Sequence, residues 1–368
     1  MKNLGLIAIV VLTGVSAFAG LVEECGVQGG IVVQVGCANS KELTTLMVSE
    51  KYLVHGLDRD VSHISDIRES LRSKGLYGPI SAAVYDGQHL PYTDNLINLL
   101  IVKESASELP TTEIMRVLVP GGIAVKGEKR IQKPWPDTID QWTHYLHGPD
   151  NNAVARDTVV AAPRTIQWVS HPKWARSHEE AASMSAMVSA QGRIFTIMDE
   201  ALNVSIRYMP DWKLIARDAF NGTLLWKRKI PLWTDHLRHF RAGPTHLPRR
   251  LVAVGNRVYV TMGLDAPVSV LDAVTGETLS TLKGTERTEE ITVKDGIVYL
   301  VIGTSEIYRM GGGLHFRNEP SATRYRYITA VDGKSGEPLW RKDFTGTKFL
   351  LPLTMTLRKG SLFYQTIN

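Results

Sequence analysis

The stretch that decides the fold is a short phrase that occurs three times: RDAFNGTLLW at 217–226, LDAVTGETL at 271–279 and VDGKSGEPLW at 331–340. Each copy places an Asp shortly before a turn glycine. An Asp carboxylate can accept hydrogen bonds from backbone N–H groups two residues further on, and glycine tolerates the positive φ of such a turn. Each copy therefore predicts a strand, a tight turn and a second strand, and the recurrence predicts a repeat architecture.

A second element recurs between these copies, a turn glycine followed by an alternating strand. It starts at Gly192, Gly255, Gly296 and Gly360. Short runs of β-branched and aromatic residues without helical periodicity predict all-β structure over residues 165–368. A repeat of about four such strands has the size of one propeller blade, so we expect propeller blades. A β-sandwich with similar hairpins is the alternative.

The repeated phrase resembles the repeat of pyrroloquinoline-quinone-type β-propellers. That superfamily includes quinone-dependent alcohol dehydrogenases and the propeller lipoprotein of bacterial outer-membrane assembly. The resemblance implies that Trp226 and Trp340 pack between neighbouring blades, whereas the middle copy continues with Ser280 and has no Trp. Because a ring of about four to eight blades removes exposed sheet edges, three complete copies predict an incomplete propeller. We therefore expect a truncated chain or the N-terminal part of a longer protein.

The first residues predict export. Met1-Lys2-Asn3 is followed by an apolar run over 4–15 and by small residues up to Ala19. This pattern is typical of a secretory signal peptide over 1–19, cleaved after Ala19. A retained anchor or a buried first strand is the alternative, although a membrane span needs about 20 apolar residues. We expect a periplasmic or secreted protein with no stable membrane span in the mature chain.

Composition sets further bounds. The chain has 368 residues, a net charge of +5 and two cysteines. It is long enough for two or more domains, and it has neither zinc-finger spacing nor a long basic block, so nucleic acid is not an expected partner. In an oxidising compartment Cys25 and Cys37 can form one disulfide, and two buried free thiols are the alternative. The sequence predicts no oligomeric state.

Residues 20–130 have a different pattern. An apolar strand over 31–35 ends at a turn, a second over 52–57 ends at Asp58, and a third over 80–84 is followed by Asp86; polar, helix-like stretches separate them. Strands that alternate with helices predict an α/β, Rossmann-like domain whose ligands bind at the carboxyl ends of parallel strands. The fold class is therefore an α/β domain followed by an incomplete all-β propeller.

The α/β part resembles the class I S-adenosylmethionine-dependent methyltransferases. Residues 33–40 match their glycine-rich first motif, and 113–122 match the helix and turn before their fifth strand. The resemblance implies that Gly36 and Ala38 lie against S-adenosylmethionine. It also implies that Asp58 binds the ribose hydroxyls and that Asp86 faces the adenine.

The sequence departs from that family at several positions. Ala38 and Ser40 stand where the family has glycines, Gln34 stands where it usually has an acid, and Asn98 replaces a second acid of the fourth motif. An exported enzyme would also lack its methyl donor, which is kept in the cytoplasm. We therefore expect a degenerate domain without methyl transfer. A working methyltransferase and a site for another nucleotide or acidic ligand are the alternatives.

A linker over 131–164 joins the two parts. Within it, residues 140–152, here named the lead-in segment, resemble the stretch that precedes the first blade of many quinone-type propellers and caps the ring. This implies that Trp142 and Tyr145 are packing anchors. His144 and His147 have the spacing of a metal pair but lack a third ligand, so polar contacts within a cap are the expected role.

A basic loop follows Thr234 and supplies four candidate anion-binding residues, Arg238, Arg241, Arg249 and Arg250. Such a loop suits an anionic small molecule or an acidic polysaccharide, and a solvated loop paired to carboxylates is the alternative. The resemblance also implies pyrroloquinoline quinone with calcium as a cofactor, but no ligand set can be assigned. The leading hypothesis is an exported propeller scaffold or binding protein, with a methyltransferase and a quinone-dependent dehydrogenase as alternatives.

Overall fold

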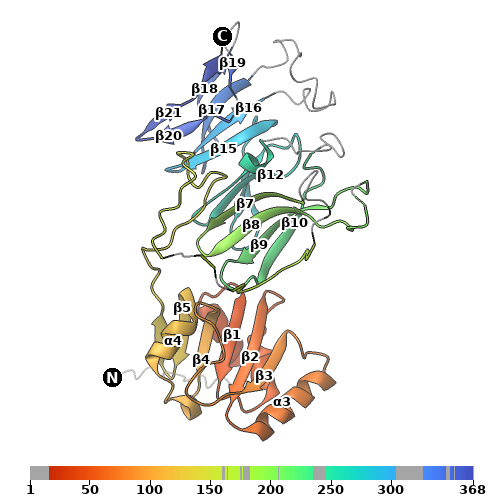
Figure 1. The fold of residues 1–368 in the computed structure, drawn as a ribbon, viewed down its shortest axis with the longest axis vertical. Coiled ribbons are helices and arrows are strands. Elements are labelled where there is room, and N and C mark those ends of the chain that lie inside the picture. Colours follow the sequence, from red (N-terminus) through yellow and green to blue (C-terminus); the bar gives the residue numbers. More distant parts are fainter. Residues whose placement is uncertain are drawn as a thin grey trace, which may run out of the picture. The chain divides into compact units, whose positions relative to one another are not determined.

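The computed structural model describes residues 16–159, 162–163, 165–174, 176, 183–205, 207–234, 246–303, 326–344, 349–351 and 353–367. The chain forms two compact units, Met1–Pro136 and Asp137–Asn368, which we call the N-terminal and C-terminal units and describe separately (Figure 1). Of the expected signal peptide, residues 1–15 lie outside the described residues, and helix α1 (Ser16–Glu24) begins at Ser16. No helix among the described residues is long and apolar enough to cross a membrane.

The N-terminal unit is built on one six-stranded sheet in the order β3-β2-β1-β4-β5-β6. The first five strands are parallel, and β6 joins β5 through a hairpin. The strands are β1 (Gly30–Val35), β2 (Tyr52–Asp58), β3 (Ile80–Val84), β4 (Ile97–Val102), β5 (Leu118–Lys126) and β6 (Lys129–Gln132). The order 3-2-1-4-5 is that of a doubly wound Rossmann-like sheet, so the predicted fold class of this part is confirmed.

Helices cover both faces of this sheet. On one face lie α1, α2 (Ser40–Leu46) and α3 (Val61–Ser73), and on the other lie η1 (Glu104–Ala106) and α4 (Thr111–Val117). Helix α3 begins after Asp60, whose carboxylate accepts a hydrogen bond from the N–H of Ser62 at 2.7 Å. Its apolar side chains recur at helical spacing and are buried against the sheet.

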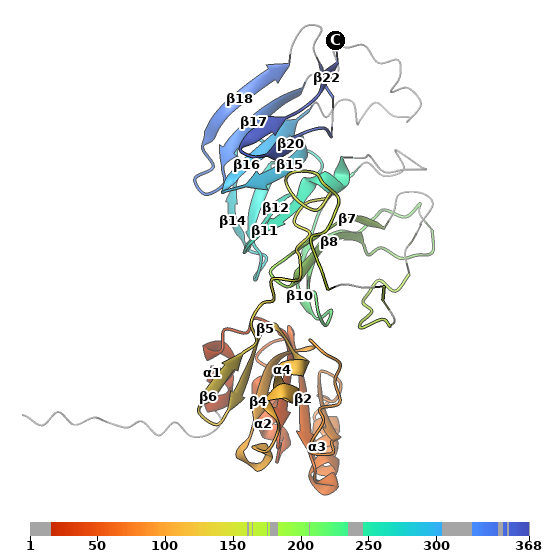
Figure 2. The ribbon, with the colours of Figure 1, turned by 60° about the vertical axis from the view of Figure 1, so that its left-hand side comes forward.

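The C-terminal unit consists of antiparallel sheets (Figure 2). Three of the sheets described have four strands each, connected up and down in chain order. They are β7 (Met184–Ala190), β8 (Arg193–Asp199), β9 (Trp212–Asp218) and β10 (Leu224–Lys229); β11 (Leu251–Val254), β12 (Arg257–Thr261), β13 (Val268–Asp272) and β14 (Thr278–Thr281); and β15 (Thr288–Lys294), β16 (Ile297–Ile302), β17 (Arg326–Asp332) and β18 (Pro338–Phe344). Two-stranded sheets pair β20 (Thr356–Arg358) with β21 (Ser361–Phe363) and β19 (Phe349–Leu350) with β22 (Thr366–Ile367).

The repeated phrase forms the same turn in each four-stranded sheet. Oδ1 of Asp218, Asp272 and Asp332 accepts a hydrogen bond from the N–H two residues further on, at 2.8, 2.8 and 3.0 Å. The turn glycines have φ of 73°, 78° and 77°, which only glycine adopts readily. The predicted strand, turn and strand are confirmed at all three copies.

Tryptophans dock on these turns. The Trp226 indole donates to the carbonyl oxygen of Ala273 at 3.1 Å, and its ring lies where a Cβ on Gly276 would be only 2.6 Å away. Trp168, which the sequence analysis did not single out, makes the same pair of contacts with Ala219 and Gly222. Each docking therefore uses the missing side chain of a glycine as well as an indole N–H.

The third tryptophan differs from the expectation. Trp340 is 41% exposed, and its ring contacts Tyr299 of its own sheet at a centroid distance of 6.2 Å. No turn of another sheet lies against it among the described residues, so the inter-blade packing expected for Trp340 is not seen there. The middle copy has no tryptophan. Leu282, which follows it, lies 3.6 Å from the Cβ position of Gly336, the turn glycine of the next sheet.

Substitution of Gly276 should separate backbone strain from loss of tryptophan docking. Gly276→Ala and Gly255→Ala both place a side chain at positive φ, which costs about 1–2 kcal/mol. Only the first also meets the Trp226 ring, and such overpacking costs about 1–3 kcal/mol more. We expect urea unfolding to give the lower free energy of unfolding for Gly276→Ala. Equal losses in the two variants would contradict the docking role.

Candidate functional site

The carboxyl edge of the N-terminal sheet gathers three of the sequence-predicted residues. Gly36 follows β1, Asp58 ends β2, and Asp86 follows β3. The strand order β3-β2-β1 makes these ends neighbours, with Val35 paired to Leu57 and Asp58 paired to Val84. The fourth predicted residue, Ala38, is exposed in the loop between β1 and α2.

Gly36 is required by packing of the protein on itself. Its φ is 82°, and a Cβ would lie 2.4 Å from the Ser105 hydroxyl oxygen and 3.1 Å from the Lys103 Cβ. The N–H groups of Gly36 and Cys37 both donate to the carbonyl oxygen of Leu57, at 2.8 and 3.2 Å. These two donors are therefore used within the fold, whereas a phosphate- or nucleoside-binding loop directs such groups at its ligand.

A polar group that sequence reasoning missed lies beside this loop. The buried Gln34 amide donates to Glu42 at 2.5 Å, and the Lys103 ammonium lies 3.4 Å from the same carboxylate oxygen. Glu42 comes from the first turn of α2, so it supplies a carboxylate close to where Gln34 replaces the family's acid. Nothing in the linear pattern marked Glu42, because an acidic residue in a first helical turn is common.

The two acids at the edge also hold their own loops. Asp58, whose side chain is 17% exposed, accepts a hydrogen bond through Oδ1 from the N–H of Asp60 at 2.8 Å. Asp86 accepts through Oδ1 from the N–H groups of Gln88 and His89, both at 2.7 Å. The N–H groups of His89 and Gln88 hold the pKa of Asp86 below its usual range. Both side chains are therefore held by backbone N–H groups at the same edge of the sheet.

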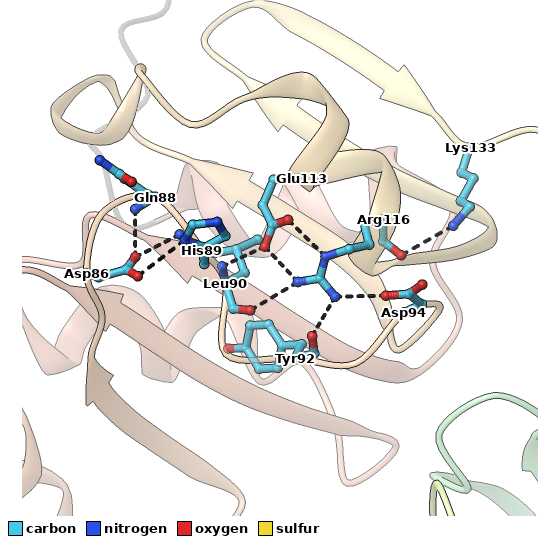
Figure 3. A network of polar contacts seen from close by, with 9 residues as sticks. All are labelled: Asp86, Gln88, His89, Leu90, Tyr92, Asp94, Glu113, Arg116 and Lys133. Atoms are coloured by element: carbon cyan, nitrogen blue, oxygen red, sulfur yellow. Dashed lines mark hydrogen bonds and ion pairs between the residues drawn. The ribbon is translucent and has the colours of Figure 1, made fainter. Parts of the chain in front are cut away.

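Glu113 and Arg116 of α4 clamp the segment that follows Asp86 (Figure 3). Glu113 accepts from the Leu90 N–H at 2.7 Å and pairs with Arg116 at 2.6 Å. Arg116 in turn donates to the carbonyl oxygen of Tyr92 at 2.7 Å and to Asp94 at 2.9 Å. The hydrogen bonds from Arg116 hold the pKa of Glu113 below its usual range. The strongest motif match is thus a device that positions the loop carrying Asp86.

Tyr92 of this loop packs against the sheet. Its hydroxyl lies 2.6 Å from His55 Nδ1, and burial lowers the pKa of His55. On the opposite face, burial raises the pKa of the Cys37 thiol to about 12. Cys25 and Cys37 are both buried free thiols in this structure, so the disulfide alternative is not what it shows.

The predicted basic loop is only partly described. Arg238 and Arg241 lie outside the described residues. Arg249 pairs with the buried Glu290 at 2.5 Å, and burial raises the pKa of that carboxyl to about 6. Arg250 donates to the Thr261 hydroxyl at 2.8 Å and lies over the ring of Trp233. Both described arginines are buried and held by internal partners, so they are not available to an external anion.

The lead-in segment crosses the first strand of each of the three four-stranded sheets and of the β20–β21 sheet. Each of these strands donates one backbone N–H to it: Ser189 of β7 to the Trp142 carbonyl at 2.7 Å, Ala253 of β11 to Thr143 at 3.0 Å, Val293 of β15 to His144 Nε2 at 3.0 Å, and Leu357 of β20 to Pro149 at 2.9 Å. Because β7, β11 and β15 are the edge strands of their sheets, these N–H groups have no partner within the sheet.

His144 and His147 make polar contacts that hold the lead-in segment in place. Burial lowers the pKa of His144 to about 3, so its ring is neutral and accepts the hydrogen bond from Val293. His147 Nε2 lies 2.6 Å from Asp140. Trp142 donates from its indole to the carbonyl oxygen of Tyr145 at 3.0 Å. Within the described ranges no group of three or more His, Cys, Asp or Glu side chains is arranged to hold a metal ion.

Comparison with known proteins supports a methyltransferase-like N-terminal unit. No family model matches the chain. The curated protein "Methyltransferase GfsG" of Streptomyces halstedii is 32% identical over 108 residues, which are 28% of this chain and 39% of that protein. The chain thus spans about two fifths of the length of this relative. The methyltransferase-like character rests on this relative together with the strand order of the sheet.

Solved structures are similar over about a third of the chain. A SAM-dependent methyltransferase from Aquifex aeolicus is 23% identical, with a TM-score of 0.27 over 32% of this chain and 69% of that chain. A geranyl diphosphate C-methyltransferase from Streptomyces coelicolor, in complex with Mg²⁺, geranyl diphosphate and S-adenosyl-L-homocysteine, is 17% identical, with a TM-score of 0.27 over 30% of this chain and 44% of that chain.

Arg116→Gln should destabilise the N-terminal unit in a pH-dependent way. The variant loses hydrogen bonds to a charged group, worth about 1.5–3 kcal/mol. Because the folded pKa of Glu113 lies below its unfolded value, this contribution is fully present above the unfolded pKa. It is lost as the pH falls through the folded pKa. Urea unfolding should therefore show a gap from the wild type at pH 7 that narrows in acid.

Arg130→Gln is the matched control for this experiment. Arg130 pairs with Glu24 at 2.8 Å, but both side chains are largely exposed. Such surface pairs contribute about 0–1 kcal/mol. Equal losses in the Arg116 and Arg130 variants would contradict the clamp.

Proposed function

We propose that the N-terminal unit is a methyltransferase-like module that binds S-adenosyl-L-methionine, or a closely related adenosine nucleoside, at the carboxyl edge of its sheet. The observation that carries this proposal is the meeting of Asp58 and Asp86 at the ends of adjacent parallel strands. Ligands of doubly wound sheets bind at this edge, and a carboxylate at the end of the second strand suits ribose hydroxyls. The methyltransferase-like relative supports the same ligand class.

The residues of this edge suit the ribose and adenine of such a ligand. They do not form the open glycine-rich loop that would approach the rest of it. Asp58, 17% exposed, accepts a hydrogen bond from the Asp60 N–H, and the Glu113–Arg116 clamp holds the loop that carries Asp86. In contrast, the Ser105 side chain occupies the space beside Gly36, and the Gly36 N–H already donates to the carbonyl oxygen of Leu57. S-adenosyl-L-methionine would supply an electrophilic methyl group. The edge residues would hold its ribose and adenine, and a general base for methyl transfer cannot be assigned to any residue of this edge.

We propose that this module belongs to an exported protein. The positive start, apolar run and small residues that end at Ala19 support a cleaved signal peptide and a periplasmic or secreted location. Outside the cytoplasm, where the methyl donor is not kept, the ligand would be a closely related adenosine nucleoside, which the module would bind without turning it over. A working methyltransferase remains the alternative and would release S-adenosyl-L-homocysteine from S-adenosyl-L-methionine in the presence of an acceptor.

Calorimetric titration of the full chain with S-adenosyl-L-methionine tests the proposal. We expect saturable one-to-one binding that Asp58→Asn weakens about tenfold or more, because a hydrogen bond to a charged group contributes about 1.5–3 kcal/mol. Asp66→Asn, on the exposed face of α3, should bind like the wild type. Absence of saturable binding to the folded wild-type chain would overturn the proposal, and unchanged affinity of Asp58→Asn would remove Asp58 from the site.

For the C-terminal unit we propose a second function, a scaffold of propeller blades. Three up-and-down sheets, two tryptophan dockings on repeated turns and a lead-in segment that crosses four first strands all support this arrangement. A sandwich of two sheets would not present one edge strand per sheet to a single crossing segment.

A quinone-type cofactor does not fit the described residues. The adjacent acids Glu289 and Glu290 of β15 pair with Arg326 and Arg249, so they do not form an acidic calcium site. In the part of the chain that the structure describes, no other acidic cluster takes this role. We therefore assign no step to pyrroloquinoline quinone or calcium, and the scaffold function does not depend on them.

His144→Leu tests the scaffold. The variant leaves the buried Val293 N–H without an acceptor, which costs about 1–3 kcal/mol at pH 7. Since the folded pKa of His144, about 3, lies below its unfolded value of about 6.5, wild-type stability should fall as the pH drops through this window, and the variant should lack that component. Urea unfolding between pH 7 and pH 4 measures both effects. His63→Leu, exposed on α3, is the control, and a loss equal to that of His144→Leu would contradict the role of His144.

A further inference from the structure

The lead-in segment and the hairpin tips of the C-terminal unit line an open cavity of about 1120 Å³. Lead-in residues on its lining include His147 and Asn151, and hairpin residues include Gln191, Gly255 and Lys294. This volume is that of a small-molecule site. Its wall is defined by turns of fixed geometry, because Gln191 has a φ of 50° and stands in a tight two-residue turn.

The lining is charged on one side. The residue after each N–H that donates to the lead-in segment occupies an equivalent position in its strand: Ala190, Val254, Lys294 and Arg358. The first two are apolar and the last two are cationic. Lys359, next to Arg358 in the turn of β20 and β21, adds a third cation from the hairpins, and Arg156 of the linker is a fourth cation on the lining. The repeat therefore presents positive charge from its third and fourth sheets alone.

Within the part of the chain that the structure describes, the three hairpin cations have no internal counter-charge. Among the described residues, no carboxylate or hydrogen-bond acceptor pairs with the side chains of Lys294, Arg358 or Lys359, and all three line the same cavity. Two acids also line it, but their charges are already engaged. Asp140 accepts hydrogen bonds from His147 Nε2 at 2.6 Å and from two backbone N–H groups, and Asp150 lies 3.8 Å from Arg156.

We propose that this cavity binds a small multivalent anion with two or more phosphate or carboxylate groups. Like charges that converge on one space repel each other unless an anion lies between them. Among the described residues of the lining, only His147 has an aromatic ring, so the cavity lacks the stacking surfaces that a nucleobase, a sugar ring or a quinone uses. Separate cations from two hairpins instead match separate oxyanion groups.

Calorimetric titration of the full chain with inorganic triphosphate and with citrate, at low ionic strength, tests this inference. We expect saturable one-to-one binding of at least one probe. Lys294→Glu should weaken it about tenfold or more, the effect of losing one charge-assisted contact and adding a repulsive charge. Lys283→Glu, exposed on the same unit and outside the cavity, makes the same change in net charge and should stay within about twofold of the wild type.

Each outcome decides the inference. Binding of triphosphate alone assigns a phosphate ligand, and binding of citrate alone assigns a carboxylate ligand. Binding of neither probe, or equal affinity of the Lys294→Glu and Lys283→Glu variants, would overturn it and leave a solvated basic rim. If Lys294→Glu fails to fold, the double variant Arg358→Gln and Lys359→Gln takes its place. Asp58→Asn should leave anion binding unchanged, so failure here is distinct from failure of the nucleoside site.

Discussion

The C-terminal unit depends on one constraint, the unpaired backbone N–H groups of its edge strands. Such groups are costly when buried and invite aggregation when exposed. The lead-in segment resolves this by supplying one acceptor to each of four first strands in succession: three carbonyl oxygens and the neutral ring of His144. Crossing sheets in this way fixes where their hairpin tips lie, and the shared cavity follows from that placement. One stretch of irregular chain thus organises elements that are far apart in sequence.

In the N-terminal unit, a pair of charged side chains holds backbone groups that lie outside the sheet. The loop after β3 carries Asp86 but has no secondary structure of its own, and the Glu113–Arg116 pair of α4 binds its backbone at Leu90 and Tyr92. The same pair lies in the segment with the strongest resemblance to the methyltransferases, and here this segment positions a loop. Three of the departures, Gln34, Ala38 and Ser40, lie in or beside the loop after β1, and the N–H of Gly36 in that loop is bonded to Leu57. A module that holds a nucleoside without reacting with it is consistent with both observations.

Elements with a local signature could be predicted from the sequence. The Asp and Gly of each repeat specify a turn without help from the rest of the chain, and the alternation of 31–35, 52–57 and 80–84 with polar stretches specified a parallel sheet. Features set by long-range contacts could not. Trp168 docks like Trp226 although no complete phrase surrounds it. Arg249 is a candidate anion-binding residue by sequence, because its partner Glu290 is distant along the chain. The packing that requires a glycine at position 36 could not be predicted either, because Ser105 contacts Gly36 only in the folded chain.

Amide hydrogen exchange tests the central claim most directly. If the lead-in segment binds four first strands as one body, the N–H groups of Ser189, Ala253, Val293 and Leu357 should be protected and should share one opening free energy, since one movement of the segment exposes all four. Neighbouring N–H groups that bond within each sheet should open with their own free energies. Rapid exchange of these four groups, or four unrelated opening free energies, would contradict the account.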